Sequence, residues 1–321
     1  MPEQTAPQWP DALRIAVLLP CFNEAAAIER VVRNFAHALP TARIFVFDNA
    51  STDETAVRAA QAGAQVRYVA LAGKGNVVRR MFADVDADVY VLADGDDTYH
   101  APSAVRLIDE LLRRGLDMVV GTRVHQAVEA YRSGHRFGNR MLTGAMGGIF
   151  GGRFTDMLSG YRVFSRRFVK SFPAMSHGFE IETELTIHAL ELRMPYGEVA
   201  TPYGVRPEGS ASKLRTYSDG IRILSTIIRL FAVEKPLRFY AWVSLLLALV
   251  SLGLAVPLIL TWLQTGLVPR FPTAILSAGV GILSGLSLTA GLILETVTIG
   301  RRETRHLHYL ASGPVPADLL E

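Results

Sequence analysis

The sequence predicts an α/β fold, in which an open, mostly parallel sheet with flanking helices is followed by an amphipathic interfacial helix and two transmembrane helices. Three observations predict it. Short apolar runs alternate with helical apolar patterns over residues 14–121, as in strand–helix–strand units. Polar clusters follow several of the apolar runs. Residues 239–294 carry one charge, Arg270, although charged residues make up 20% of the chain. This composition excludes a purely soluble, an all-membrane and a disordered protein.

The elements of the sheet follow in chain order. Short apolar runs predict strands at residues 14–19, 44–47, 66–69, 89–93 and 118–121. Between them, Ile28, Val31, Val32 and Phe35 recur at helical spacing, and further helices are expected after Asp53 and over 77–85 and 104–112. Right-handed crossovers make such strands parallel, and ligands then bind beyond their carboxyl ends.

The nearly uncharged block contains two apolar runs, 239–263 and 271–297. Each exceeds the roughly 20 residues that a helix needs to cross a bilayer. A short turn with two prolines separates them, which predicts a membrane hairpin; the alternative is a buried hairpin of a soluble protein. Basic residues flank the hairpin on both sides, so both termini are expected in the cytoplasm. No signal peptide is expected, because the apolar run at 15–19 is too short.

Residues 216–237 are expected to form an amphipathic helix at the membrane surface. Their apolar side chains recur at helical spacing, while arginines lie on other faces. The alternative is an ordinary helix packed on the preceding domain. The expected organisation is an N-terminal tail (1–12), a cytoplasmic α/β domain (13–215), this helix (216–237), the hairpin (238–297) and a basic cytoplasmic tail (298–321).

An acidic turn follows the predicted strand at 89–93. Asp94, Asp96 and Asp97 would repel one another there unless water or a cation screened them. Mg²⁺ and Mn²⁺ take oxygen ligands and bridge to phosphates, so this turn is a candidate metal and diphosphate site. The alternative is a solvated turn. Cys21, the single cysteine, has no intrachain disulfide partner and is expected to pack at a strand end.

Six ordered motifs resemble those of family 2 glycosyltransferases, which have the GT-A fold, a Rossmann-like open sheet. They are Pro20-Cys21-Phe22-Asn23-Glu24, Asp48-Asn49-Ala50-Ser51-Thr52-Asp53, Gly73-Lys74-Gly75, Asp94-Gly95-Asp96, Asp156-Met157-Leu158-Ser159-Gly160-Tyr161-Arg162 and Gly209-Ser210-Ala211-Ser212-Lys213. Over about residues 13–235 the chain is most similar to polyprenyl-phosphate sugar transferases, namely dolichyl-phosphate mannose synthase and its bacterial relatives. The hairpin fits the bacterial branch, which implies a location in the bacterial inner membrane.

The resemblance implies roles for individual residues. The residues implied to bind the donor nucleotide are Pro20, Asn23, Glu24, Asp48, Lys74 and Asp94. Asp94 and Asp96 match the pair that binds Mg²⁺ or Mn²⁺. Thr98 stands where mannose synthases often carry a Gln near the metal, so a third protein ligand stays open. Those implied for the acceptor phosphate are Arg123, Arg136, Asn139 and Arg162. Arg206 and Lys213 match a loop that closes over the diphosphate and are counted, with Asp94, Asp96 and Arg136, as catalytic.

The reaction implied is inverting transfer of a hexose from a nucleotide sugar to a polyprenyl phosphate at the cytoplasmic membrane face. A phosphate monoester needs no general base, because its second pKa of about 6 leaves it mostly dianionic at neutral pH. UDP-glucose or UDP-N-acetylglucosamine is favoured as donor, and GDP-mannose stays open. A homo-oligomer formed through the membrane helices is also expected.

The sequence disfavours three alternatives. A processive polysaccharide synthase would carry a Gln-x-x-Arg-Trp motif, which this sequence lacks. An inactive nucleotide-sugar-binding scaffold would have no need to keep Asp94, Asp96, Arg206 and Lys213. A nucleic-acid partner is disfavoured, because the basic residues flank the membrane segments.

A second cluster of polar residues comprises Glu180, Glu182, Glu184 and His188. It could suggest a second metal site, but a structural or acceptor-side role is preferred, and Glu184 is expected to orient arginines.

Overall fold

The computed structural model describes residues 9–10, 12–125, 144, 147–152, 154–176, 178, 180–207 and 216–314. The chain divides into two compact units. The first contains residues 1–225 and 305–321, and the second contains residues 226–304.

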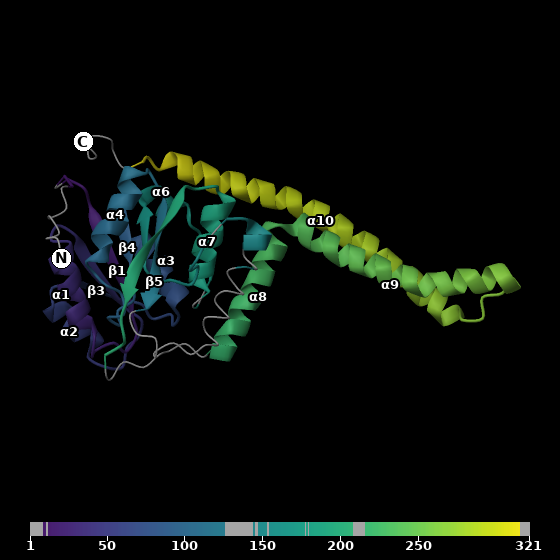
Figure 1. Cartoon of the computed structure of the whole chain (residues 1–321), viewed down its shortest axis with the longest axis horizontal. Helices are drawn as coiled ribbons and strands as arrows, with labels where there is room; N and C mark the ends of the chain where they lie inside the picture. Colours follow the sequence, from purple (N-terminus) through teal and green to yellow (C-terminus); the bar gives the residue numbers. More distant parts are fainter. Residues whose placement is uncertain are drawn as a thin grey trace. The chain divides into compact units, whose positions relative to one another are not determined.

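The first unit is built on a seven-stranded sheet with strand order β3-β2-β1-β4-β6-β5-β7. The strands are β1 (Ile15–Cys21), β2 (Arg43–Asp48), β3 (Gln65–Tyr68), β4 (Val89–Leu92), β5 (Met118–His125), β6 (Arg162–Ser165) and β7 (Tyr196–Tyr203). Neighbouring strands are parallel except at β6, which runs antiparallel to both β4 and β5. The prediction of a mostly parallel α/β sheet is confirmed (Figure 1).

Helices cover both faces of this sheet. They are α1 (Ile28–Ala38), α2 (Thr55–Gln61), α3 (Lys74–Asp84), α4 (Ser103–Arg113), α6 (Arg166–Ser171) and α7 (Ile181–Glu191). Successive residues of β1 alternate between two cores: Val17 packs with α1, α2 and α4, whereas Leu18 packs with α3, α6 and α7. Burial on both faces explains why the strands are continuous apolar runs.

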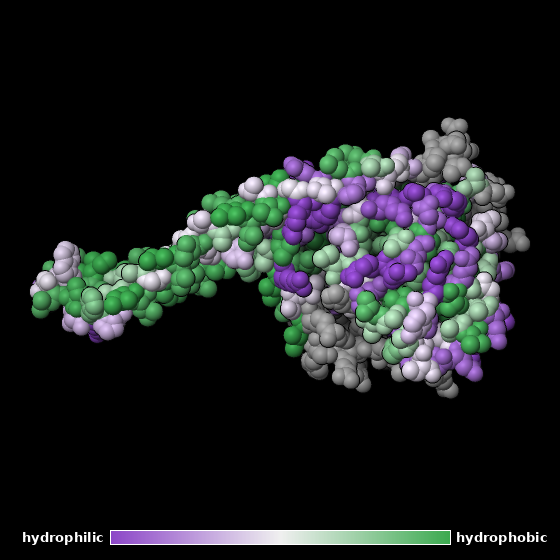
Figure 2. Space-filling model, turned by 180° about the vertical axis from the view of Figure 1, so that it is seen from behind, coloured by the Kyte–Doolittle hydropathy of each residue, from purple (hydrophilic) through white to green (hydrophobic). Residues whose placement is uncertain are grey.

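The second unit contains the end of α8 (Thr216–Glu234), α9 (Pro236–Thr265) and most of α10 (Phe271–Ala311). Both α9 and α10 are long and apolar enough to cross a membrane. Only 11% and 17% of their most apolar windows are buried, and the visible surface of the hairpin is mostly hydrophobic (Figure 2). This exposure contradicts the alternative of a buried hairpin in a soluble protein.

Small polar residues hold the hairpin together. The hydroxyl of Ser251 donates to the carbonyl of Ser277 at 2.8 Å, and the hydroxyl of Ser277 donates to the carbonyl of Ser251 at 2.9 Å. A second pair lies seven residues before Ser251 and seven residues after Ser277, where the hydroxyl of Ser284 donates to the carbonyl of Ser244 at 2.8 Å. The heptad spacing keeps one face of each helix in contact, as expected for slightly supercoiled helices.

The end of α10 differs from the predicted organisation. The helix continues beyond residue 297 to Ala311, and its residues from 305 onward belong to the first unit. There the hydroxyl of Tyr309 donates to Asp117 Oδ2 at 2.9 Å, and the guanidinium of Arg167 lies 5.0 Å from the Tyr309 ring centre. The sequence interpretation ended the hairpin with the apolar run, whereas no proline follows residue 297 until Pro314.

Candidate active site

The acidic turn follows β4 and separates its three carboxylates. Asp97 has a φ of 59° and pairs with Arg30 of α1, Nε to Oδ2, at 2.5 Å. Asp96 is almost completely buried, and its Oδ1 accepts the hydroxyl of Thr98 at 2.6 Å and the Thr98 backbone N–H at 3.2 Å. Thr98 therefore orients Asp96, and the third carboxylate is turned toward α1.

Each carboxylate of the predicted metal pair is in contact with a basic side chain. Lys74 Nζ lies 2.5 Å from Asp94 Oδ1, and Arg206 Nη2 lies 2.6 Å from Asp96 Oδ2. Burial and the charge of Asp94 raise the pKa of Asp96, although Arg206 and Thr98 oppose this. Burial lowers the pKa of Lys74, but the charges of Asp94 and Glu182 outweigh it and raise this pKa above its ordinary value. The site thus concentrates negative charge.

Two glycines let the backbone approach this site closely. A Cβ on Gly95 would lie 2.4 Å from the sulfur of Cys21, which is buried. A Cβ on Gly160 would lie 3.0 Å from both Lys74 Nζ and Asp94 Oδ2. Cys21 therefore packs against the acidic turn, in agreement with its expected packing role.

The residues expected to bind the donor nucleotide follow the adjacent strands β1 and β2. Pro20 pairs with Phe47 and Cys21 with Asp48 in the parallel register, which brings the two strand ends together. The Asn23 side chain accepts the Thr52 N–H at 2.8 Å, and the Glu24 N–H donates to the Thr55 hydroxyl at 2.8 Å. The structure thus joins the first two motifs into one edge of the sheet; nucleotide binding there stays a prediction.

Asn49 and Glu182 make contacts at the site that the sequence interpretation did not predict. The side-chain amide of Asn49 donates to the carbonyls of Val69 and Leu71 at 2.9 and 2.8 Å, and its oxygen accepts the N–H of Gly73 at 2.7 Å. These bonds position the start of α3, where Lys74 lies. Glu182 Oε1 lies 2.6 Å from Lys74 Nζ. In the sequence, the position of Asn49 directly after Asp48, at a strand end, could have indicated that Asn49 belongs to the site.

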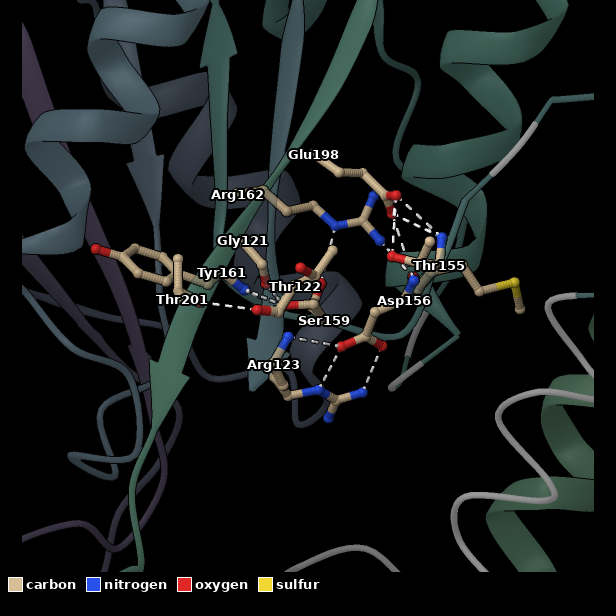
Figure 3. A network of polar contacts seen from close by, with 12 residues as sticks. Gly121, Thr122, Arg123, Thr155, Asp156, Ser159, Tyr161, Arg162, Glu198 and Thr201 are labelled. Atoms are coloured by element: carbon tan, nitrogen blue, oxygen red, sulfur yellow. Dashed lines mark hydrogen bonds and ion pairs between the residues drawn. The ribbon is translucent and has the colours of Figure 1, made fainter. Parts of the chain in front are cut away.

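Arg123 lies at the end of β5 in a polar network (Figure 3). Its Nε and Nη2 each lie 2.7 Å from a different oxygen of Asp156, and its guanidinium lies 5.7 Å from the centre of the Tyr203 ring. Glu198 of β7 accepts the Thr155 N–H at 2.8 Å beside Asp156. The two-point pairing fixes the plane of the Arg123 guanidinium.

Arg162 differs from its expected role. The side chain is completely buried, and it donates to the carbonyls of Ser159 and Met157 and to the hydroxyl of Thr186. Burial lowers its pKa to about 10, against the charges of Glu182 and Asp156. Its N–H donors are directed to the protein interior and are not available to an acceptor phosphate. Arg162 instead holds the turn that carries Asp156 and Gly160.

The residues of α7 also bear on earlier expectations. Glu184 accepts the backbone N–H groups of Met175 and Ser176 at 2.8 and 2.7 Å, so the expectation that it orients arginines was wrong for the contacts described. His188 Nε2 lies 3.1 Å from the Ser171 hydroxyl, and burial lowers the pKa of His188 to about 3.

Among the described residues, no group of three or more acidic, His or Cys side chains could hold a metal. Arg136, Asn139 and Lys213 lie outside the described residues.

Asp94 and Asp96 fit a divalent cation together with substrate oxygens. Carboxylate oxygens suit Mg²⁺ and Mn²⁺, and Mg²⁺ is commonly held by one or two carboxylates plus phosphates and water. Burial and, after it, the charge of Asp94 raise the pKa of Asp96, and a bound cation would offset the repulsion between the two carboxylates. The donor set therefore suits a metal shared with a diphosphate.

Comparison with known proteins gives the same family. Residues 16–172 match glycosyl transferase family 2. An uncharacterized protein of Shigella flexneri is 59% identical over 155 residues, which cover 48% of this chain and 95% of that protein. Glycosyltransferase AglJ of Haloferax volcanii is 32% identical over 291 residues, which cover 87% of this chain and 95% of that protein.

A solved structure is similar to part of this chain. It is glucosyl-3-phosphoglycerate synthase from Mycobacterium tuberculosis, in complex with Mn²⁺, uridine diphosphate and glucosyl-3-phosphoglycerate. Its TM-score is 0.54 at 25% identity, and the match covers 70% of this chain and 84% of that one.

Proposed function

The chain belongs to glycosyl transferase family 2, and from this premise we propose that it transfers a hexose from a nucleotide sugar to a polyprenyl phosphate at a membrane surface. The observation that carries the proposal is the combination of an Asp94–Asp96 site in the first unit with two helices apolar enough to cross a membrane in the second. UDP-glucose or UDP-N-acetylglucosamine is the favoured donor, and GDP-mannose is the alternative. A homo-oligomer and a cytoplasmic location of the site belong to the same proposal.

The proposed step is a displacement at the anomeric carbon. An oxygen of the lipid phosphate forms the new bond, the bond to the donor diphosphate breaks, and the nucleoside diphosphate leaves with the electron pair, so that the configuration inverts. When bound, a divalent cation at Asp94 and Asp96 supplies Lewis-acid stabilisation of the leaving diphosphate. No nucleophilic side chain is required.

Basic side chains of the site suit the two phosphate groups. Arg206 and Lys74 already lie at the acidic pair, so both are placed to contact a diphosphate bound there. Arg123 is the described candidate for the acceptor phosphate, since guanidinium groups bind phosphate oxygens in pairs. Asp156 keeps the Arg123 guanidinium in one orientation. Arg136 and Asn139 are proposed acceptor ligands from the resemblance alone.

A panel of labelled nucleotide-sugar donors, called the donor panel, tests this proposal. Purified protein is incubated with undecaprenyl phosphate, Mg²⁺ or Mn²⁺, and radiolabelled UDP-glucose, UDP-N-acetylglucosamine or GDP-mannose. We expect one donor to label the lipid fraction, and EDTA to abolish the labelling. If no donor labels the lipid while the lipid phosphate is confirmed present, the proposal is wrong.

A soluble phosphate is the second candidate acceptor. The similar mycobacterial enzyme was solved with glucosyl-3-phosphoglycerate, so phosphoglyceric acid belongs in the same panel. The exposed apolar hairpin favours the lipid.

A further inference from the structure

Lys74 lies between two carboxylates, of which only Asp94 belongs to the proposed metal pair. Its Nζ is 2.5 Å from Asp94 Oδ1 and 2.6 Å from Glu182 Oε1. The side chains of Lys74 and Glu182 are only 9% and 6% exposed. Lys74 begins α3 and Glu182 lies in the first turn of α7, and these two helices pack together. Charges in such a poorly hydrated place interact strongly.

Glu182 has acceptor capacity that the structure does not use. Among the described residues, its Oε2 is buried and has no hydrogen-bond partner. An unsatisfied buried acceptor is unfavourable. A lysine ammonium carries three N–H donors, so a movement of Lys74 away from Asp94 and toward Glu182 would satisfy this oxygen.

Gly160 leaves the space around this ion pair open. Its missing side chain would lie 3.0 Å from both Lys74 Nζ and Asp94 Oδ2. A side chain at this position would therefore crowd both the ammonium and the carboxylate, whereas glycine leaves both groups uncrowded on this side.

We propose that Glu182 is a second binding position for the Lys74 ammonium. Lys74 neutralises Asp94 while the metal is absent, and it shifts to Glu182 when a divalent cation binds Asp94. The inference rests on the proposed function, because it requires a metal at Asp94 and Asp96. Glu182 is a positioning residue that acts through Lys74. Without its charge, metal binding would leave a buried ammonium beside a divalent cation with one compensating carboxylate fewer.

Binding of Mn²⁺ alone tests the inference without any turnover. Free Mn²⁺ is measured by electron paramagnetic resonance during titration of the full-length, detergent-solubilised protein, with no donor present. We expect Glu182→Gln to raise the Kd for Mn²⁺ about tenfold or more. The free energy that corresponds to a tenfold change in Kd lies within the range of coupling energies between contacting residues. Lys74→Met should not weaken Mn²⁺ binding. In the Lys74→Met background, Glu182→Gln should have little further effect.

Glu180→Gln is the matched control for simple loss of a nearby negative charge. Glu180 directly precedes α7, and its Oε1 accepts the N–H of Gly178 at 3.1 Å; its variant should bind Mn²⁺ as the wild type does. The melting temperature of each variant checks folding. Equal effects of Glu182→Gln with and without Lys74 would overturn this inference alone. Absence of Mn²⁺ binding in the wild type would overturn it together with the proposed metal site, and the donor panel would still decide the transfer reaction.

Discussion

Gly95 separates the two carboxylates of the proposed metal site, and its replacement by alanine tests how the turn positions them. An alanine Cβ would lie 2.4 Å from the sulfur of Cys21 and 3.5 Å from Ile28 Cδ1. Relief to an ordinary contact, which begins at 3.4 Å, needs a movement of about 1 Å, and a misplacement of that size can lower a rate about 100-fold. Overpacking of this kind costs about 1–3 kcal/mol of stability. We therefore expect Gly95→Ala to lose about 100-fold in kcat.

Removal of the sulfur should reverse this effect. Cys21→Ala alone should retain activity, and the double variant Cys21→Ala/Gly95→Ala should recover most of the rate lost by Gly95→Ala. The assay is transfer of radiolabelled sugar to undecaprenyl phosphate, with the melting temperature measured in parallel. Gly148→Ala is the control, because a Cβ there has no atom within 4 Å. Full activity of Gly95→Ala, or a double variant no more active than the single one, would refute the reasoning.

Four further predictions concern other parts of the first unit. Asp96→Asn should abolish sugar transfer and weaken Mn²⁺ binding; an Mn²⁺ titration identical to that of the wild type would show that Asp96 is not a metal ligand. Arg162→Met leaves buried oxygens without donors and should cost about 3 kcal/mol, seen as a lower melting temperature. His188 has a pKa lowered to about 3, so its contribution to stability should be full above about pH 6.5 and fall by up to about 1.4 kcal/mol per pH unit between about pH 6.5 and pH 3; in His188→Gln this slope should flatten. Tyr309→Phe removes a donor to buried Asp117 and should accelerate hydrogen exchange over residues 305–311, whereas unchanged exchange would contradict the contact.

The sequence predicted the first five strands and the intervening helices because each has a short, strong apolar pattern. It did not predict β6 or β7. β6 has only four residues, and its place between β4 and β5 depends on partners far along the chain. Within α7 the sequence indicated only the helical spacing of Glu184 and His188, because the buried residues include Glu182, Thr183 and Glu184.

The acidic pair and the strand ends around it were also predicted from the sequence. The roles of individual charges were not, because they depend on contacts between distant residues. Arg30 of α1 takes Asp97 away from the other two carboxylates. The Arg162 motif is visible in the sequence, but the complete burial of its side chain becomes visible only once β6 and α7 are in place.

The central claim is that the acceptor is a lipid phosphate, and an acceptor comparison tests it most directly. The full-length protein is given one labelled donor, a divalent cation, and either undecaprenyl phosphate, undecaprenol or phosphoglyceric acid. We predict labelled product with undecaprenyl phosphate alone, since undecaprenol lacks the nucleophilic phosphate and phosphoglyceric acid lacks the membrane anchor. Labelled phosphoglyceric acid, or labelling of undecaprenol at the same rate, would contradict the claim.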